Sequence, residues 1–190
     1  MQYRESGMPD MELWETFFDP VSFLKTLELN PHTNNYLDVG SGFGTFLIPA
    51  SKIISGSAIG IDVNQEYLDI CSKRIGEENL QNIYLIHGDS SNEKTLETVT
   101  QYVSEVDYIS LFNMLHCEEP LELLNRTAQL LNPKGKLGVI HWKSNKTPRG
   151  PTMAIRPSPR KVRGWGEQAG LTFLKTSDLS PYHFGVLFEK

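Results

Sequence analysis

The sequence predicts an α/β fold in which a mostly parallel sheet of seven strands carries helices on both faces. Three observations predict it. Apolar runs of strand length alternate with helical patterns over short connections, which favours parallel pairing. The first run, Tyr36–Val39, leads straight into glycines at alternate positions, and the next run, Ala58–Asp62, ends on an acid. A glycine turn that follows a strand is where α/β sheets bind nucleoside-type ligands.

Each element has a local signal. Residues 11–29 place large apolar side chains at helical spacings, and Pro20 separates two short helices. Pro120 suits a first helical turn, and Asn132–Gly135 is a turn signal. We expect strands at 36–39, 58–62, 83–87, 108–112 and 136–141, and helices near 43–54, 65–75, 93–102 and 121–131.

The pattern changes after residue 142. Residues 143–160 contain four prolines and Gly150, which predicts a long ordered loop, called the flap below. A short helix near 160–169 is expected to end at Gly170, followed by strands at 171–176 and 183–188. We expect a single domain over residues 1–190, with an N-terminal helical segment at 1–30.

Composition is typical of a globular protein, with 39% apolar and 22% charged residues among 190. No apolar run approaches the roughly 18 residues of a membrane span. Residues 1–6 lack the layout of an export signal, so we expect a cytoplasmic protein. The two cysteines, Cys71 and Cys117, form neither a disulfide framework nor a metal pattern, and we expect both as reduced thiols.

Charge is distributed unevenly along the chain. The net charge is −5, but residues 123–166 contain no acid and ten basic residues. Such a segment suggests either an anionic partner or a solvated basic surface, and the sequence leaves both open.

The glycine spacing indicates which ligand to expect. A dinucleotide fingerprint starting at Gly40 and Gly42 requires its third glycine at position 45, which is Thr45, so a nicotinamide oxidoreductase is disfavoured. The observed pattern, Asp38-x-Gly-x-Gly-x-Gly44, resembles motif I of the class I, Rossmann-like S-adenosylmethionine-dependent methyltransferases. The resemblance continues through most of the chain after Tyr36. A structural glycine turn in another α/β protein is the alternative.

The resemblance implies S-adenosylmethionine as the cofactor and gives roles to three acids. Asp38 accepts the ammonium of the methionine end, Asp62 accepts both ribose hydroxyls, and Asp89 binds the adenine amine, although Asp89 is also placed to cap a helix. The segment 112–116 lines the methionine end and faces the acceptor. The expected cofactor-binding residues are Asp38, Gly40, Ser41, Gly42, Gly44, Asp62, Val63, Asp89, Ser90 and Asn113.

Departures from related families narrow the acceptor. Residues 112–115 lack the Asn/Asp-Pro-Pro-Tyr/Phe motif of base-amine methylators, so a nucleic acid is disfavoured. Residues 141–143 lack the acidic cluster of metal-dependent relatives, so no metal is expected. What remains resembles the small-molecule group that includes quinone-biosynthesis C-methyltransferases. An RNA-directed methyltransferase and a non-catalytic S-adenosylmethionine-binding module stay as alternatives, and the sequence does not indicate an oligomeric state.

Candidate residues for the acceptor follow the fourth and fifth strands. His116 and His141 are candidate catalytic bases because histidine titrates near neutrality, although either also suits a structural role. Arg149 and Arg156 on the flap are candidates to bind an anionic group, since their planar fork matches a carboxylate or phosphate. Trp142 is placed to stack on the acceptor or simply to pack.

Overall fold

The computed structural model describes residues 8–190 and contains one seven-stranded sheet in the order β3-β2-β1-β4-β5-β7-β6. Residues 1–7, the start of the expected N-terminal segment, lie outside the described residues. Strands β1 to β5 pair in parallel, whereas β7 runs antiparallel to both β5 and β6, so the predicted mostly parallel sheet is confirmed. The strands are β1 (Tyr36–Val39), β2 (Ala58–Asp62), β3 (Ile83–His87), β4 (Val106–Phe112), β5 (Leu131–Trp142), β6 (Thr172–Leu179) and β7 (His183–Glu189).

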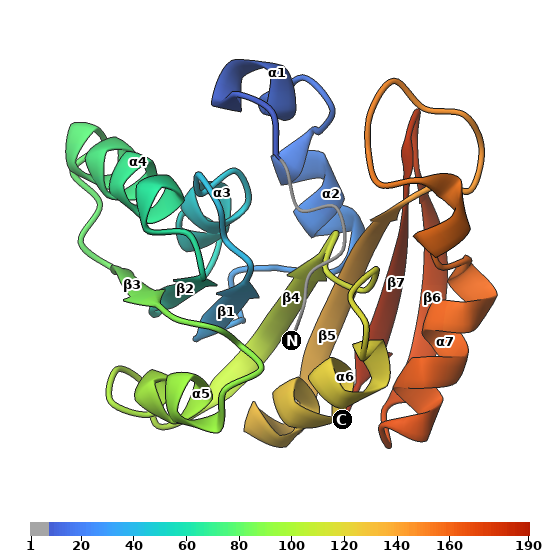
Figure 1. The fold of residues 1–190 in the computed structure, drawn as a ribbon. Helices are drawn as coiled ribbons and strands as arrows, with labels where there is room; N and C mark the ends of the chain where they lie inside the picture. The colour runs from blue at the N-terminus through green and yellow to red at the C-terminus, as the bar shows by residue number, and fades with distance from the viewer. Residues whose placement is uncertain (1–7) are drawn as a thin grey trace.

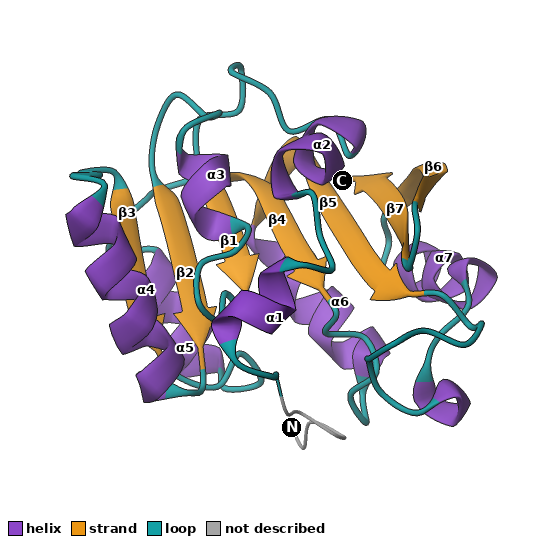
Figure 2. Cartoon of the chain, turned by 90° about the horizontal axis from the view of Figure 1, so that it is seen from above, coloured by secondary structure: helices purple, strands orange, loops and turns teal. Residues whose placement is uncertain are grey.

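Helices cover both faces of the sheet, as expected (Figure 1). One face carries α2, α3 and α4, and the other carries α5, α6 and α7. Figure 2 shows α1 beside the carboxyl ends of β1 and β4. The helices are α1 (Met11–Glu15), α2 (Pro20–Thr26), α3 (Leu47–Ser51), α4 (Gln65–Glu77), α5 (Glu93–Val99), α6 (Pro120–Leu130) and α7 (Pro159–Gln168), with a 3-10 turn at Met153–Ile155 inside the flap.

Strand β1 divides its side chains between two cores. Because successive strand residues point to opposite faces, Leu37 and Val39 join one apolar cluster and Tyr36 joins the other. The first cluster contains residues of α5, α6 and α7, and the second contains residues of α2 and α3. Asp38 therefore shares the α2–α3 face with Tyr36, at the carboxyl end of the strand.

Several expected boundaries differ by two to five residues, and the two largest differences are at α3 and β5. The helix expected near 43–54 is limited to α3, because Gly40, Gly42 and Gly44 have φ of +79°, +53° and +81° and the chain cannot become helical before it leaves them. Strand β5 begins at Leu131, so the expected turn at 132–135 lies within a strand instead. A positive φ at Lys134 and a shift in the β4–β5 register mark this irregularity.

The flap leaves the sheet at the end of β5 and returns at α7, where Ser158 caps the helix by accepting from the amide of Lys161. No helix within residues 8–190 is both long and apolar enough to cross a membrane. Over the same residues, no group of three His, Cys, Asp or Glu side chains is arranged to hold a metal ion.

Candidate functional site

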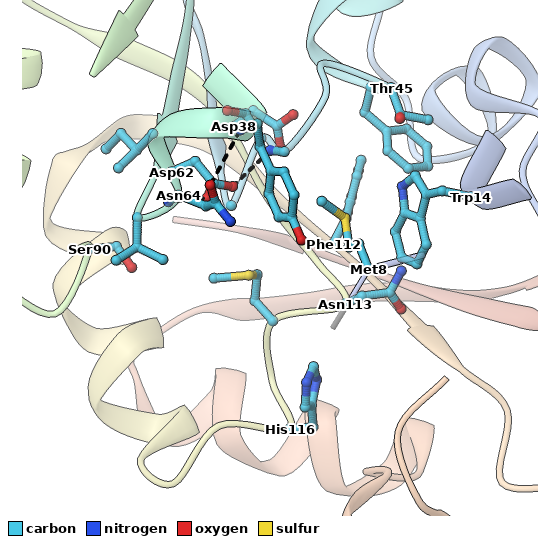
Figure 3. A pocket seen from close by; sticks show the side chains of 18 of the residues that line it. Met8, Trp14, Asp38, Thr45, Asp62, Asn64, Ser90, Phe112, Asn113 and His116 are labelled. Atoms are coloured by element: carbon cyan, nitrogen blue, oxygen red, sulfur yellow. Dashed lines mark hydrogen bonds between the residues drawn. The ribbon is translucent and has the colours of Figure 1, made fainter. Parts of the chain in front are cut away.

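A cavity of about 290 Å³ opens at the carboxyl ends of β1, β2, β4 and β5 (Figure 3). Strand β1 pairs with β2 on one side and β4 on the other, so the connections diverge at this point of the sheet. Open α/β sheets bind ligands at such a switch point. Walls from β1 and β2 form one half of the cavity, and walls from β4, β5 and the flap form the other.

The glycine turn after β1 forms the floor of the first half. The amides of Gly40 and Ser41 both donate to the carbonyl of Ile61, at 2.8 and 3.0 Å, and so fix the turn against β2. A Cβ on Gly40 would lie 2.4 Å from Sδ of Met114, so no larger residue fits without displacing that side chain. The hydroxyls of Ser41 and Thr45 are buried at this turn without a hydrogen-bond partner.

Asp38 is a buried carboxylate in the cavity wall, only 3% exposed. Its Oδ1 accepts from the Ser110 hydroxyl at 2.6 Å, and the Tyr36 hydroxyl lies 2.7 Å from the same Ser110 oxygen. Burial raises the pKa of Asp38 to about 7, although the bond from Ser110 opposes the shift. A carboxylate held by a neutral hydroxyl in a buried wall is suited to a cationic ligand group.

Asp62 lies at the end of β2 and faces the same space (Figure 3). Its Oδ2 accepts from the Gly42 amide at 2.8 Å, and its Oδ1 accepts from the Asn64 amide at 2.9 Å. Burial raises its pKa, while these amides lower it. The Val63 amide also lowers this pKa, so three of the roughly four acceptor sites of the carboxylate face backbone amides and one is left for a ligand hydroxyl. The contact with the ribose hydroxyls stays a prediction.

Some of the other predicted cofactor residues line the cavity and some do not. Val63, Ser90 and Asn113 line the cavity. Asp89 does not, and its Oδ1 accepts from the Ser91 amide at 2.7 Å in a turn before α5. Gly44 does not line the cavity either, because it packs against α4, where an added Cβ would lie 2.6 Å from Sγ of Cys71.

The segment after β4 lines the second half of the cavity. Asn113 has a positive φ of 58°, and its amide donates to the carbonyl of Ile140 at 2.7 Å, which ties the turn to β5. Both polar atoms of the Asn113 side chain are buried without a hydrogen-bond partner. Met114 and His116 also line the cavity, and Figure 3 shows the His116 side chain.

The two predicted bases occupy different environments. His116 lines the cavity, whereas His141 is fully buried behind it, with the two ring centroids 5.5 Å apart. Burial lowers the pKa of His141 to about 3, and His116 adds to the shift. The structure therefore brings His116 to the cavity but keeps His141 neutral in the core.

Of the three residues predicted to contact the acceptor, two line the cavity and one does not. Trp142 and Arg149 line the cavity, together with Gly150 and Pro151 of the flap. Arg156 does not line it, because its guanidinium points into the flap and donates to flap carbonyls.

Several lining residues were missed by sequence reasoning. Asn64 and Tyr67 sit at the start of α4, where Asn64 accepts from the amides of Glu66 and Tyr67. An asparagine directly before a helical pattern is a recognisable helix cap. Because Asn64 follows Asp62 by only two residues, the sequence could have placed both at the site. Other lining residues that were not among the expected site residues include Met8, Pro9, Thr45, Phe46, Ile61 and Gly88.

A family profile described as a methyltransferase domain matches residues 37–135. The chain belongs to the methyltransferase-domain family. The matched range includes the glycine turn, Asp62 and the segment after β4. This family membership implies S-adenosylmethionine as the cofactor, in agreement with the sequence motif.

Similar proteins support the assignment. The chain is 28% identical over 116 residues to a demethylmenaquinone methyltransferase of Lactobacillus johnsonii and 26% identical over 115 residues to one of Staphylococcus saprophyticus. Each alignment covers 59% of this chain, and the chain spans only 45% and 46% of those relatives.

Solved structures resemble the chain over a longer range. An S-adenosylmethionine-dependent methyltransferase from Aquifex aeolicus is 26% identical with a TM-score of 0.78, covering 95% of this chain and 93% of the other. A [4+2]-cyclase has a TM-score of 0.73 at 16% identity over 98% of this chain and 84% of its own, so it shares the fold alone.

The residues present fit the cofactor that the family implies. Ser41, Thr45 and Asn113 line the cavity, and each has a buried side-chain polar atom with no hydrogen-bond partner, as expected where a polar ligand completes the site. Asp38 and Asp62 add two carboxylates at separate points of the same wall. This donor and acceptor set matches an amino acid joined to a nucleoside.

Proposed function

We propose that the protein transfers a methyl group from S-adenosylmethionine to a small ring-shaped acceptor with an anionic substituent. One observation carries the proposal: a single cavity joins a polar half built on β1 and β2 to an aromatic half that reaches the basic flap. The two halves provide adjacent places for a donor and an acceptor, which is the arrangement that a group transfer needs.

In the first half, Asp38 would hold the ammonium and Asp62 the ribose hydroxyls, with Ser41, Thr45 and Asn113 binding the remaining polar groups. When bound, S-adenosylmethionine supplies an electrophilic methyl group on a sulfonium. The chain orients both reactants and excludes water, and such positioning lowers a barrier by roughly 7–11 kcal/mol.

In the second half, the half-buried Trp14 offers an aromatic surface, the mostly buried rings of Phe112 and Trp142 line the wall, and Arg149 offers a cation at the outer end. Aromatic walls favour a flat acceptor, and the arginine fork favours a carboxylate or phosphate on it. The named activity of the two curated relatives supports a ring acceptor, although the chain spans about half of their length.

His116 is the residue best placed to remove a proton from the acceptor, since it lines the cavity beside Met114. A hydroxyl or an activated ring carbon must lose its proton when it gains the methyl group. A neutral imidazole at this wall would accept that proton.

The test is a turnover assay of the full chain with S-adenosylmethionine and paired acceptors: phenol with hydroxybenzoate, and naphthol with hydroxynaphthoate. We expect S-adenosylhomocysteine and a methylated product to form, faster with the carboxylate member of each pair. Tight cofactor binding without turnover of any acceptor would instead support a non-catalytic binding module. Turnover only with RNA would support an RNA-directed enzyme.

We also infer a cytoplasmic location, which the two buried free thiols, Cys71 and Cys117, support because a reducing compartment keeps thiols unpaired. Fractionation of cells that express the protein would test it.

A further inference from the structure

The flap is organised around one side chain, that of Arg156. Its guanidinium donates to acceptors spread over residues 143–151, and four of the five are backbone carbonyls. Nε donates to Pro151 O at 2.7 Å; Nη1 donates to Lys143 O at 2.9 Å, Thr147 Oγ1 at 2.8 Å and Asn145 O at 3.2 Å; and Nη2 donates to Arg149 O at 3.1 Å.

This pattern depends on arginine. A guanidinium presents five N–H groups in a rigid plane, whereas a lysine presents three from one nitrogen. Its acceptors within residues 143–151 are neutral carbonyls and a hydroxyl, so these contacts depend on the geometry of the guanidinium. These N–H groups point at the flap, and Arg156 does not line the cavity.

A second feature places the flap against the sheet. Gly150 has a φ of +102°, and a Cβ on it would lie 2.7 Å from Cδ2 of Trp142. The backbone at Gly150 therefore packs directly on the indole. The Arg156 guanidinium carbon lies 5.8 Å from the centre of the same ring, and Trp142, which pairs with His183 of β7, is only 1% exposed.

We propose that Arg156 is a positioning residue that holds the flap in its folded conformation against Trp142. Gly150 allows this packing because it has no side chain where the flap backbone contacts the indole. Together they hold Arg149, Gly150 and Pro151 as the outer wall of the cavity. The effect on acceptor recognition rests on the proposed function. The folding of the flap does not, and it can be measured without any acceptor.

Trypsin cleavage of the full chain tests the folding step. The bonds after Lys146 and Arg149 are flap sites, and Arg156 precedes Pro157, where trypsin does not cut, so replacing Arg156 removes no site. In Arg156→Lys and Arg156→Gln, we expect cleavage after Lys146 to accelerate by about tenfold or more, because several charge-assisted hydrogen bonds are lost. Gly150→Ala should show the same acceleration.

Matched controls separate this role from general destabilisation. Arg163→Gln changes an exposed arginine of α7 that pairs with Glu167, and Gly164→Ala changes a glycine with no atom near its missing Cβ. Both should cleave after Lys146 at the parental rate. Thermal unfolding should be unchanged in the two Arg156 variants.

The fluorescence emission of Trp142 reports directly on whether the flap covers the indole. In a Trp14→Phe, Trp165→Phe background, Trp142 is the remaining tryptophan, and Arg156→Lys should shift its emission to longer wavelength as the flap uncovers it. The affinity for S-adenosylhomocysteine should stay at the parental value. With hydroxynaphthoate as acceptor, Arg156→Lys should raise KM about tenfold at constant kcat.

Parental cleavage and emission in both Arg156→Lys and Gly150→Ala would overturn the proposal. Failure of the proposed function has a different readout, since the parent protein would then not bind S-adenosylhomocysteine or turn over any acceptor, while the cleavage results would still decide whether Arg156 folds the flap.

Discussion

The two halves of the cavity are built in different ways. The half on β1 and β2 is made of short strands, a tight turn and backbone hydrogen bonds, such as those from Gly40 and Ser41 to Ile61. The half beyond β4 and β5 is made of side chains from distant segments, including Trp14, Phe112, Trp142 and Arg149. The first half is set by local geometry and the second by tertiary packing. A substitution in the first half should therefore affect the cofactor, and one in the second should affect the acceptor.

The largest expected effect is on the chemical step. His116→Gln should lower kcat by about 10²–10⁴, the usual contribution of a general base, and leave the affinity for S-adenosylhomocysteine unchanged. Steady-state kinetics and calorimetry measure the two values. His32→Gln, an exposed loop residue, is the control. A variant with parental kcat would remove His116 from the chemistry.

The cofactor half is tested most directly at Asp62. Asp62→Ala removes the proposed acceptor for ribose hydroxyls and the carboxylate that pairs with the amides of Gly42 and Asn64. We expect a loss of roughly 2–4 kcal/mol in the binding of S-adenosylhomocysteine, measured by calorimetry. Asp69→Ala, on the exposed side of α4, should bind as the parent does. Equal affinity in both variants would contradict the ribose contact.

The acceptor half has its own test at Arg149. Arg149→Ala should raise the KM for a carboxylate acceptor by about ten- to a hundredfold and leave cofactor affinity unchanged, because one charged hydrogen bond is lost at the outer wall. Lys146→Ala, an exposed flap residue that does not line the cavity, is the matched control. If KM is parental for both, the basic charge of the flap is only a solvated surface.

Acidity should affect the cofactor half through Asp38. Its pKa is about 7 because of burial, and only the ionised form attracts an ammonium. The affinity for S-adenosylhomocysteine should therefore fall by about tenfold from pH 8 to pH 6, as one proton must be released on binding. Asp38→Asn should bind more weakly and lose this dependence. Binding of the parent that is constant over this range would contradict the contact.

The smallest expected effect concerns a buried histidine behind the acceptor half. His183 packs between Phe18 and Trp142 with both ring nitrogens lacking a hydrogen-bond partner, and burial lowers its pKa to about 3 from 6.5. Only the unfolded chain gains this proton as pH falls from about 6.5 toward 3, so the folded state loses stability over that window.

A difference measurement isolates this histidine. Asp38 titrates in the opposite sense, since its raised pKa favours the folded state as pH falls. We therefore compare the parent with His183→Phe, by chemical denaturation at pH 7 and pH 5.5. The parent should lose about 1 kcal/mol relative to the variant over this range. A constant difference would mean that His183 titrates alike in both states.

The same contrast explains what the sequence could predict. All seven strands were expected, because apolar runs and turn residues are local signals, although β5 begins earlier than Lys136. Residues of the proposed cofactor half could be predicted for the same reason. Asp38, Ser41 and Asp62 lie in consecutive short motifs, and all three line the cavity.

The acceptor half was less predictable. Whether an arginine of the flap faces the cavity or the flap interior depends on a loop conformation that no periodicity encodes, and Arg149 and Arg156 differ in this respect. His116 follows β4 and His141 is the penultimate residue of β5, but the sequence does not show that His116 lines the cavity whereas His141 is fully buried.

The pairing of β1 has a consequence for folding. Asp38 lies opposite Gly60 on β2 and opposite Ser110 on β4, and Ser110 is also the residue that donates to its carboxylate. A slip of one residue against β4 would place Ile109 or Leu111 beside Asp38 and turn the carboxylate toward the apolar cluster under α5, α6 and α7. Mispaired chains would thus be unstable, and they would also lose the ammonium contact proposed for Asp38. The acid that we propose as a ligand contact therefore also favours the correct register of the sheet.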